Sequence, residues 1–100
     1  MAHRIMQVGY RWIKTVPNAV DLGPSMTALS DDWIRLNVHI WFLWTTKSPT
    51  EVYAGLRTTL SPDDSVLVAP IDISTLPSGW CPQFVWDWFR KKAELSQLGL

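Results

Sequence analysis

The sequence has little charge of either sign and almost no cysteine. Its nine lysine and arginine residues balance nine aspartate and glutamate residues, so the formal net charge is zero. A balanced charge gives no support to a strongly basic nucleic-acid-binding protein or to an acidic interaction tail. The single cysteine, Cys81, cannot form a disulfide within the chain, which favours a reducing compartment and leads us to expect a cytoplasmic protein.

Long apolar runs and the sequence motifs of common cofactor sites are also missing. No apolar run reaches the ~18 residues that a membrane span needs, and the polar start, MAHRIMQ, lacks the apolar core of a signal peptide. The chain has no Gly-x-Gly-x-x-Gly pattern, no Walker loop and no Cys-x-x-Cys pair. We therefore expect no membrane partner and no cofactor.

Apolar residues, and tryptophan above all, are abundant. They make up 47% of the 100 residues, and seven of them are tryptophan, so the chain is globular rather than disordered. No linker or repeat divides it, which predicts a single domain over 1–100. A domain of this length buries only ~65% of the surface of its unfolded chain, so a second copy would add useful buried surface.

Hydrophobic periodicity in the N-terminal half predicts three strands and one short helix. Residues 4–14 alternate with a period of two, which places Met6, Val8, Tyr10 and Trp12 on one buried face of a strand. A short helix is expected over 22–31, with Pro24 at its first position and Leu22, Met26 and Leu29 facing the core. Two strands, 33–37 and 39–46, are expected to meet at a tight turn around Asn37-Val38.

The clearest element is a helix over 49–60. Ser48 and Glu51 form a capping box with Pro49 at the first helical position, and apolar residues follow at intervals of four. Gly55 within this helix is explained if it lets the helix lie close to the sheet.

The C-terminal half continues with a buried strand over 65–71 and a helix over 83–95. The apolar stripe of that helix comprises Phe84, Val85, Trp88, Phe89, Lys92 and Leu95. The order of elements is therefore β-α-β-β-α-β followed by a helix, which is the pattern of a ferredoxin-like α+β sandwich with its first and third strands in the centre.

The stretch from Trp33 to Trp88 resembles the small CRISPR-associated Cas-two family and its relatives outside CRISPR loci. The matching features are an aromatic strand (41–44), a polar helix start (46–49), the apolar positions of the helix, the passage Pro62-Asp63-Asp64-Ser65-Val66-Leu67-Val68, Gly79-Trp80 and Trp88-Phe89-Arg90-Lys91. This resemblance implies the ferredoxin-like fold and a homodimer, with the C-terminal segment 77–100 packing on the partner protomer.

The same family's metal-dependent nuclease activity implies an aspartate that closely follows a tyrosine at the end of the first strand. Here Tyr10 is followed by Arg11 and Trp12, and no acidic residue precedes Asp21. Mg²⁺ prefers carboxylate oxygens, which neither side chain offers. The catalytic role therefore does not carry over to this chain.

No other residues form a convincing catalytic or metal-binding pattern. Asp31-Asp32 and Asp63-Asp64 stand between elements, where aspartate caps helices and stabilises turns. His3 and His39 have no other ligand at metal-binding spacing, and His39 is expected in a turn or on the surface. Cys81 at a helix start is compatible with a reactive thiol or, more commonly, with a packed loop. We predict no catalytic residue and no metal site.

Two surfaces remain as binding candidates. Nucleic acid would need clustered cations, and the candidates are Arg4, Arg11 and Lys14 on the first strand with Arg90 and Lys91 on the last helix. A dimer interface is predicted at Trp80, Phe84, Trp86 and Trp88 within 77–95. Trp86 and Trp88 lie about 200° apart around a helix, so one of them is expected to face away from its own core.

The sequence therefore favours a non-catalytic, homodimeric binding or scaffold protein, with nucleic acid as a second partner to consider. The alternatives left open are a metal-dependent endonuclease and a small protein- or ligand-binding domain.

Overall fold

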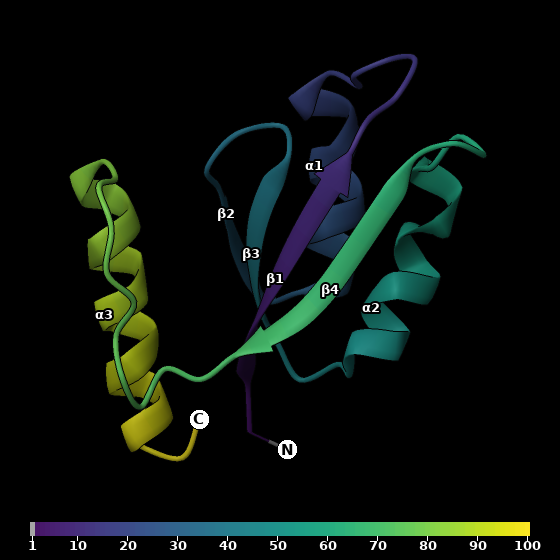
Figure 1. Cartoon of the computed structure of the whole chain (residues 1–100). Coiled ribbons are helices and arrows are strands. Elements are labelled where there is room, and N and C mark those ends of the chain that lie inside the picture. The colour runs from purple at the N-terminus through teal and green to yellow at the C-terminus, as the bar shows by residue number, and fades with distance from the viewer. Residues whose placement is uncertain (1) are drawn as a thin grey trace.

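Four antiparallel strands form one sheet at the centre of the molecule. The computed structural model describes residues 2–100, apart from the Ala19 side chain. The strands are β1 (Arg4–Arg11), β2 (Asp32–Arg35), β3 (Ile40–Thr45) and β4 (Ser65–Ile71), arranged in the order β2-β3-β1-β4. The prediction that the first and third strands are central is confirmed (Figure 1).

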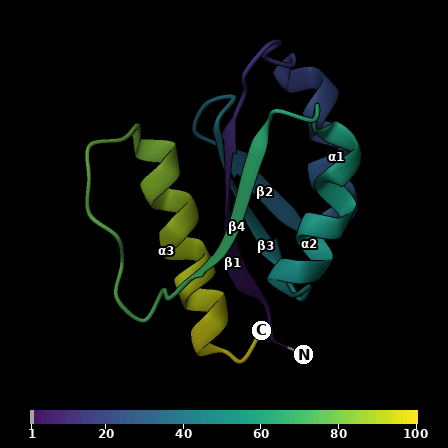
Figure 2. The same cartoon turned by 45° about the vertical axis from the view of Figure 1, so that its right-hand side comes forward.

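Helices cover both faces of this sheet. Helix α1 (Ala19–Leu29) and helix α2 (Pro49–Leu56), which a 3₁₀ turn, η1 (Arg57–Thr59), extends, lie on one face. Helix α3 (Gln83–Gln97) lies on the other, so the protein is an α+β structure of three layers (Figure 2). The order of strands and α-helices is the predicted one, and the 3₁₀ turn after α2 is an addition to it.

The alternation of β1 divides the core between the two faces. Met6, Val8, Tyr10 and Trp12 join the inner cluster with α1 and α2, as predicted. Ile5 belongs to an outer cluster together with Phe42, Trp44, Val85 and Phe89. The apolarity of both faces of β3 is explained because α3 covers the side of the sheet that α1 and α2 leave open.

The predicted start of α1 was wrong. The helix begins at residue 19 rather than 22, because the Asn18 side chain accepts a hydrogen bond from the Val20 main-chain N–H (3.1 Å) and caps the helix there. Pro24 consequently lies inside the helix and not at its first position. The predicted core positions Leu22, Met26 and Leu29 are all buried.

The hairpin turn is longer than predicted. The Asn37 side chain accepts from the main-chain N–H groups of His39 (2.8 Å) and Ile40 (3.0 Å), which draws 36–39 into the turn. Strand β2 therefore ends at Arg35 and β3 begins at Ile40. Strand β1 also stops early, at Arg11, because the Ile13 main-chain N–H binds Asp64 Oδ1 (3.0 Å) instead of continuing the sheet.

The capping box of α2 is confirmed. Ser48 accepts from the Glu51 N–H (3.1 Å), and the Glu51 carboxylate accepts from the Ser48 N–H (3.0 Å). The hydrogen bond from the Ser48 N–H, together with the Ser48 hydroxyl, lowers the pKa of the Glu51 carboxyl. Regular helix ends at Leu56, where the prediction extended it to residue 60. The close neighbour of Gly55 is Leu29 at the end of α1, not the sheet, so the predicted reason for this glycine was wrong.

Candidate functional site

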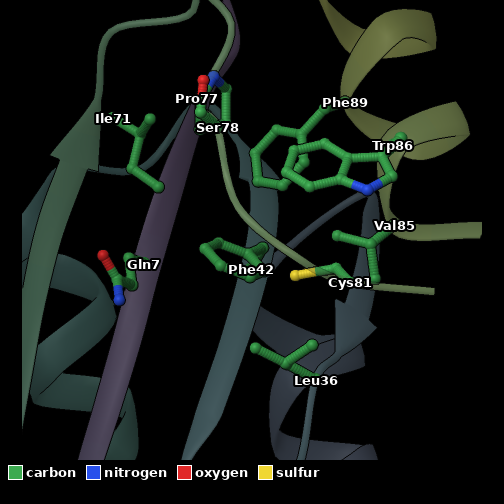
Figure 3. Close-up of a pocket in the computed structure, with 10 residues that line it drawn as sticks. All are labelled: Gln7, Leu36, Phe42, Ile71, Pro77, Ser78, Cys81, Val85, Trp86 and Phe89. Atoms are coloured by element: carbon green, nitrogen blue, oxygen red, sulfur yellow. The ribbon is translucent and has the colours of Figure 1, made fainter. Parts of the chain in front are cut away.

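A cavity of about 190 Å³ lies between α3 and the outer face of the sheet. Its floor comes from β1, β3 and the end of β4, and its walls come from the loop 72–82 and the first turns of α3 (Figure 3). The apolar side chains around it are Leu36, Phe42, Ile71, Pro77, Val85, Trp86 and Phe89. The cavity is thus mostly apolar, as ligand and side-chain pockets usually are.

Three polar side chains interrupt this apolar lining: Gln7, Ser78 and Cys81. Gln7 reaches the cavity because the alternation of β1 turns it to the same face as Ile5. Around the cavity, Phe42 and Phe89 pack edge to face (5.0 Å between ring centroids), and Trp86 lies 6.5 Å from Phe89. Among residues 2–100, none of the side chains that line it is charged, so the site suits a neutral ring better than an ion.

Two aromatic side chains stand in solvent beside this cavity. Trp80, in the loop that forms one wall, is 101% exposed relative to the reference residue, and Phe84 on the first turn of α3 is 53% exposed. Phe84 was predicted to belong to the apolar stripe of the helix, and that prediction was wrong. The stripe is Val85, Phe89 and Lys92, which are buried.

The prediction that either Trp86 or Trp88 faces away from its own core was also wrong. Both are half-buried, because they flank the buried stripe of α3 on opposite sides. Trp86 lines the cavity, whereas Trp88 packs edge to face on Phe89 (5.6 Å) and donates its indole N–H to Asp32 Oδ2 (2.9 Å).

An ion pair between a buried lysine and a half-exposed aspartate fastens α3 to the edge strand β2. Lys92 is 7% exposed, and its ammonium lies 2.7 Å from Asp32 Oδ2. The same ammonium lies over the rings of Trp88 (5.3 Å) and Trp44 (5.8 Å). Burial opposes ionisation of Asp32, but the hydrogen bonds from Lys92 and Trp88, the positive charge of Lys92 and the Trp33 N–H together lower its pKa.

The two ends of the described chain meet next to this ion pair. The His3 ring stacks on Trp44 (5.0 Å, 9°), and its Nε2 contacts the carboxylate of Asp31. The His3 main-chain N–H donates to the Leu100 main-chain oxygen (2.7 Å), which also lies 2.7 Å from His3 Nδ1. Strand β1 and the end of α3 are therefore tied together through His3.

Sequence reasoning missed this polar cluster. It assigned Asp31 and Asp32 to capping and turn formation, whereas both carboxylates bind side chains from distant segments. The available signal was Lys92, a cation at a position of the apolar stripe that faces the core. Such a lysine requires an acidic partner, because burying an unpaired ammonium is costly.

The structure does not gather the candidate nucleic-acid-binding cations into one place. Arg4 and Arg11 mark opposite ends of β1, and Lys14 beyond it pairs with Asp63 (3.6 Å). Arg90 and Lys91 are exposed on α3, on the other side of the sheet from α1 and α2, and the Arg90 guanidinium lies 3.7 Å from Asp87.

The remaining candidates are placed as follows. Asp64 caps a turn by accepting from the Ser61 N–H (2.9 Å) and the Ile13 N–H (3.0 Å), and His39 is exposed in the hairpin turn. Cys81 is a free, half-buried thiol on the cavity wall. Within residues 2–100, no group of three or more histidine, cysteine, aspartate or glutamate side chains is arranged to hold a metal ion.

Comparison with protein-family models, with curated proteins and with solved structures gives no match to this chain. In the part of the chain that the structure describes, no helix has the length and apolarity to cross a membrane.

Proposed function

We propose that this chain is a non-catalytic, homodimeric binding or scaffold protein of ferredoxin-like fold that works in the cytoplasm. The observation that carries the proposal is the pair of exposed aromatic side chains, Trp80 and Phe84, at the start of α3. Burying the side chains of tryptophan and phenylalanine is favourable, so a second copy that covers them would gain this free energy on dimerisation.

The fold supports this assembly. The element order and the strand order β2-β3-β1-β4 are typical of ferredoxin-like sandwiches. The resemblance of 33–88 to the Cas-two family favours a homodimer. The exposed Arg11 at the end of β1, where that family's acidic residue would stand, favours a role without catalysis.

The surface itself has the composition of an interface. Trp80 and Phe84 are joined on the same segment by Leu76, which is 44% exposed. Aromatic residues are enriched at protein–protein interfaces, and tryptophan is enriched among the residues that carry most of the binding free energy, whereas lysine is depleted. A protein partner of the same sequence therefore fits better than nucleic acid, for which the cations are dispersed.

Sedimentation velocity over a range of protein concentrations tests the proposal. We expect a dimer for the wild type and an at least ~10-fold weaker dimer for Phe84→Ser, which corresponds to about 1.4 kcal/mol. Tyr53→Ser on α2 is the matched control, because Tyr53 is also an exposed helical aromatic but lies in the other layer. A wild-type chain that stays monomeric at about 100 µM contradicts the proposal.

A binding measurement with a single-stranded oligonucleotide separates the alternative partner. Binding that weakens steeply as salt is raised would favour nucleic acid, because counterion release dominates such contacts. We expect no such binding at physiological salt.

A further inference from the structure

The exposed Trp80 and the cavity under α3 are complementary to each other. We propose that, in the homodimer, the Trp80 indole of one protomer inserts into the cavity of its partner, and that the partner's Trp80 does the same in return. This inference rests on the homodimer proposed above and names the contact that holds it together.

The cavity has the right size for an indole. It encloses about 190 Å³. A cavity of about 150 Å³ lined by apolar side chains accommodates benzene. The two fused rings of an indole need somewhat more room than the single ring of benzene, and the additional volume provides it.

The walls of the cavity also match an indole chemically. Phe42, Trp86 and Phe89 present aromatic faces and edges, which favour edge-to-face packing with an inserted ring. Gln7 is one of the polar side chains that line the cavity. The lining includes two side chains with acceptor oxygens, Gln7 and Ser78, and a buried indole N–H needs such a partner.

The positions of ring and cavity allow both insertions at once. Trp80 lies between Ser78 and Cys81 in the sequence, and both of those side chains line the cavity. The inserting group and the receiving cavity are therefore neighbours on one surface. A two-fold axis through that surface pairs each Trp80 with the opposite cavity and closes the dimer, whereas a group and a cavity on distant surfaces would build larger rings or open filaments.

Two variants interrupt the contact from its two sides. Trp80→Ala removes the ring and keeps the cavity. Cys81→Phe keeps the ring and fills the cavity from its wall, where Cys81 is half-buried. By sedimentation we expect each variant alone to dimerise at least ~100-fold more weakly than the wild type, as for other central interface tryptophans. Circular dichroism and thermal unfolding establish that each variant folds.

Mixing the two variants provides the decisive measurement. A heterodimer can still place Trp80 of the Cys81→Phe chain into the open cavity of the Trp80→Ala chain. We therefore expect the mixture to form heterodimers at concentrations at which each variant alone is monomeric. No such recovery would occur if the substitutions merely damaged the surface.

The remaining outcomes separate this inference from the homodimer itself. If Trp80→Ala dimerises as the wild type does, the insertion is wrong and the homodimer stands. The same holds if the emission that Trp80→Ala removes from the dilute monomer is already blue-shifted, because the ring then fills its own cavity. Two monomeric variants that form no heterodimer also overturn the insertion, and a monomeric wild type overturns both proposals.

Discussion

At the scale of single residues, Lys92 joins α3 to the edge strand β2 through a charged contact. Its stem is buried among apolar neighbours, and its ammonium is held by Asp32 and by the faces of two indoles. The sequence indicated that Lys92 belongs to the buried stripe, but not which acid it meets. Asp32 lies far away in the sequence, and the pairing depends on how β2 and α3 are placed across the sheet.

Removing the carboxylate should therefore cost more than removing the whole pair. We expect Asp32→Asn to lower the free energy of unfolding by about 2 kcal/mol, because it leaves a buried ammonium without its anion. The loss stays below the 3–5 kcal/mol typical of a fully buried pair because the Asp32 side chain is 48% exposed and partly screened by water. The double variant Asp32→Asn/Lys92→Met should recover most of it. Urea unfolding measures both, and a double variant as unstable as the single one contradicts this interpretation.

The same carboxylate makes stability depend on acid pH. The pKa of Asp32 is lower in the folded protein than its ordinary value of 3.8, so its contribution is complete above that value and is lost as the pH falls through the folded pKa. We expect the stability difference between wild type and Asp32→Asn to be constant from pH 7 to about 5 and to shrink below about 4. Urea titrations at several pH values check this, and a difference that persists unchanged at the acid end assigns it to another cause.

At the scale of elements, the start of a helix could be predicted where one local signal marks it, but not where two signals compete. The capping box that runs from Ser48 to Glu51 specifies the start of α2 in only four residues, and the structure confirms this start. The start of α1 was mistaken because Asn18 and Pro24 are both start signals, and only the cap at Asn18 is used. The role of Gly55 depends on the approach of α1, which no local pattern reveals.

The contact between α1 and α2 predicts a specific coupling. A Cβ added at Gly55 would overlap the Cδ2 methyl of Leu29, so Gly55→Ala gains about 1 kcal/mol of helix propensity but strains a buried side chain by about 1–3 kcal/mol. We expect it to destabilise the wild type by about 1 kcal/mol and to stabilise a Leu29→Ala background by a similar amount. A double-mutant cycle from urea unfolding measures the coupling. Equal effects of Gly55→Ala in both backgrounds would show that Leu29 adapts without cost.

At the scale of the whole molecule, the sheet order followed from the sequence, whereas the attachment of α3 to its own sheet did not. The apolar residues on both sides of β3 indicated that both faces of the sheet are covered. The tryptophans crowded into 77–95 suggested instead that this segment contacts a partner. The structure accounts for both features. Helix α3 packs on the outer face through Val85 and Phe89, and a cavity and two exposed aromatic side chains remain at its N-terminal end.

This unequal packing predicts that α3 is the least stable layer of the monomer. Among the described residues, the outer cluster has five buried members and the inner cluster has eleven, and the cavity removes further contacts between α3 and the sheet. In dilute solution, native-state hydrogen exchange should show α3 amides opening at a lower free energy than those of β1 and β3.

His3→Ala should lower the opening free energy of the amides at the end of α3 by about a further 1 kcal/mol, because it removes the hydrogen bond between the His3 side chain and Leu100. It should leave the opening free energies of α1 and α2 unchanged. Raising the protein concentration should protect the start of α3 first, since dimerisation covers that end. Exchange of α3 only at the free energy of global unfolding, whatever the concentration, would mean that the three layers unfold as one unit.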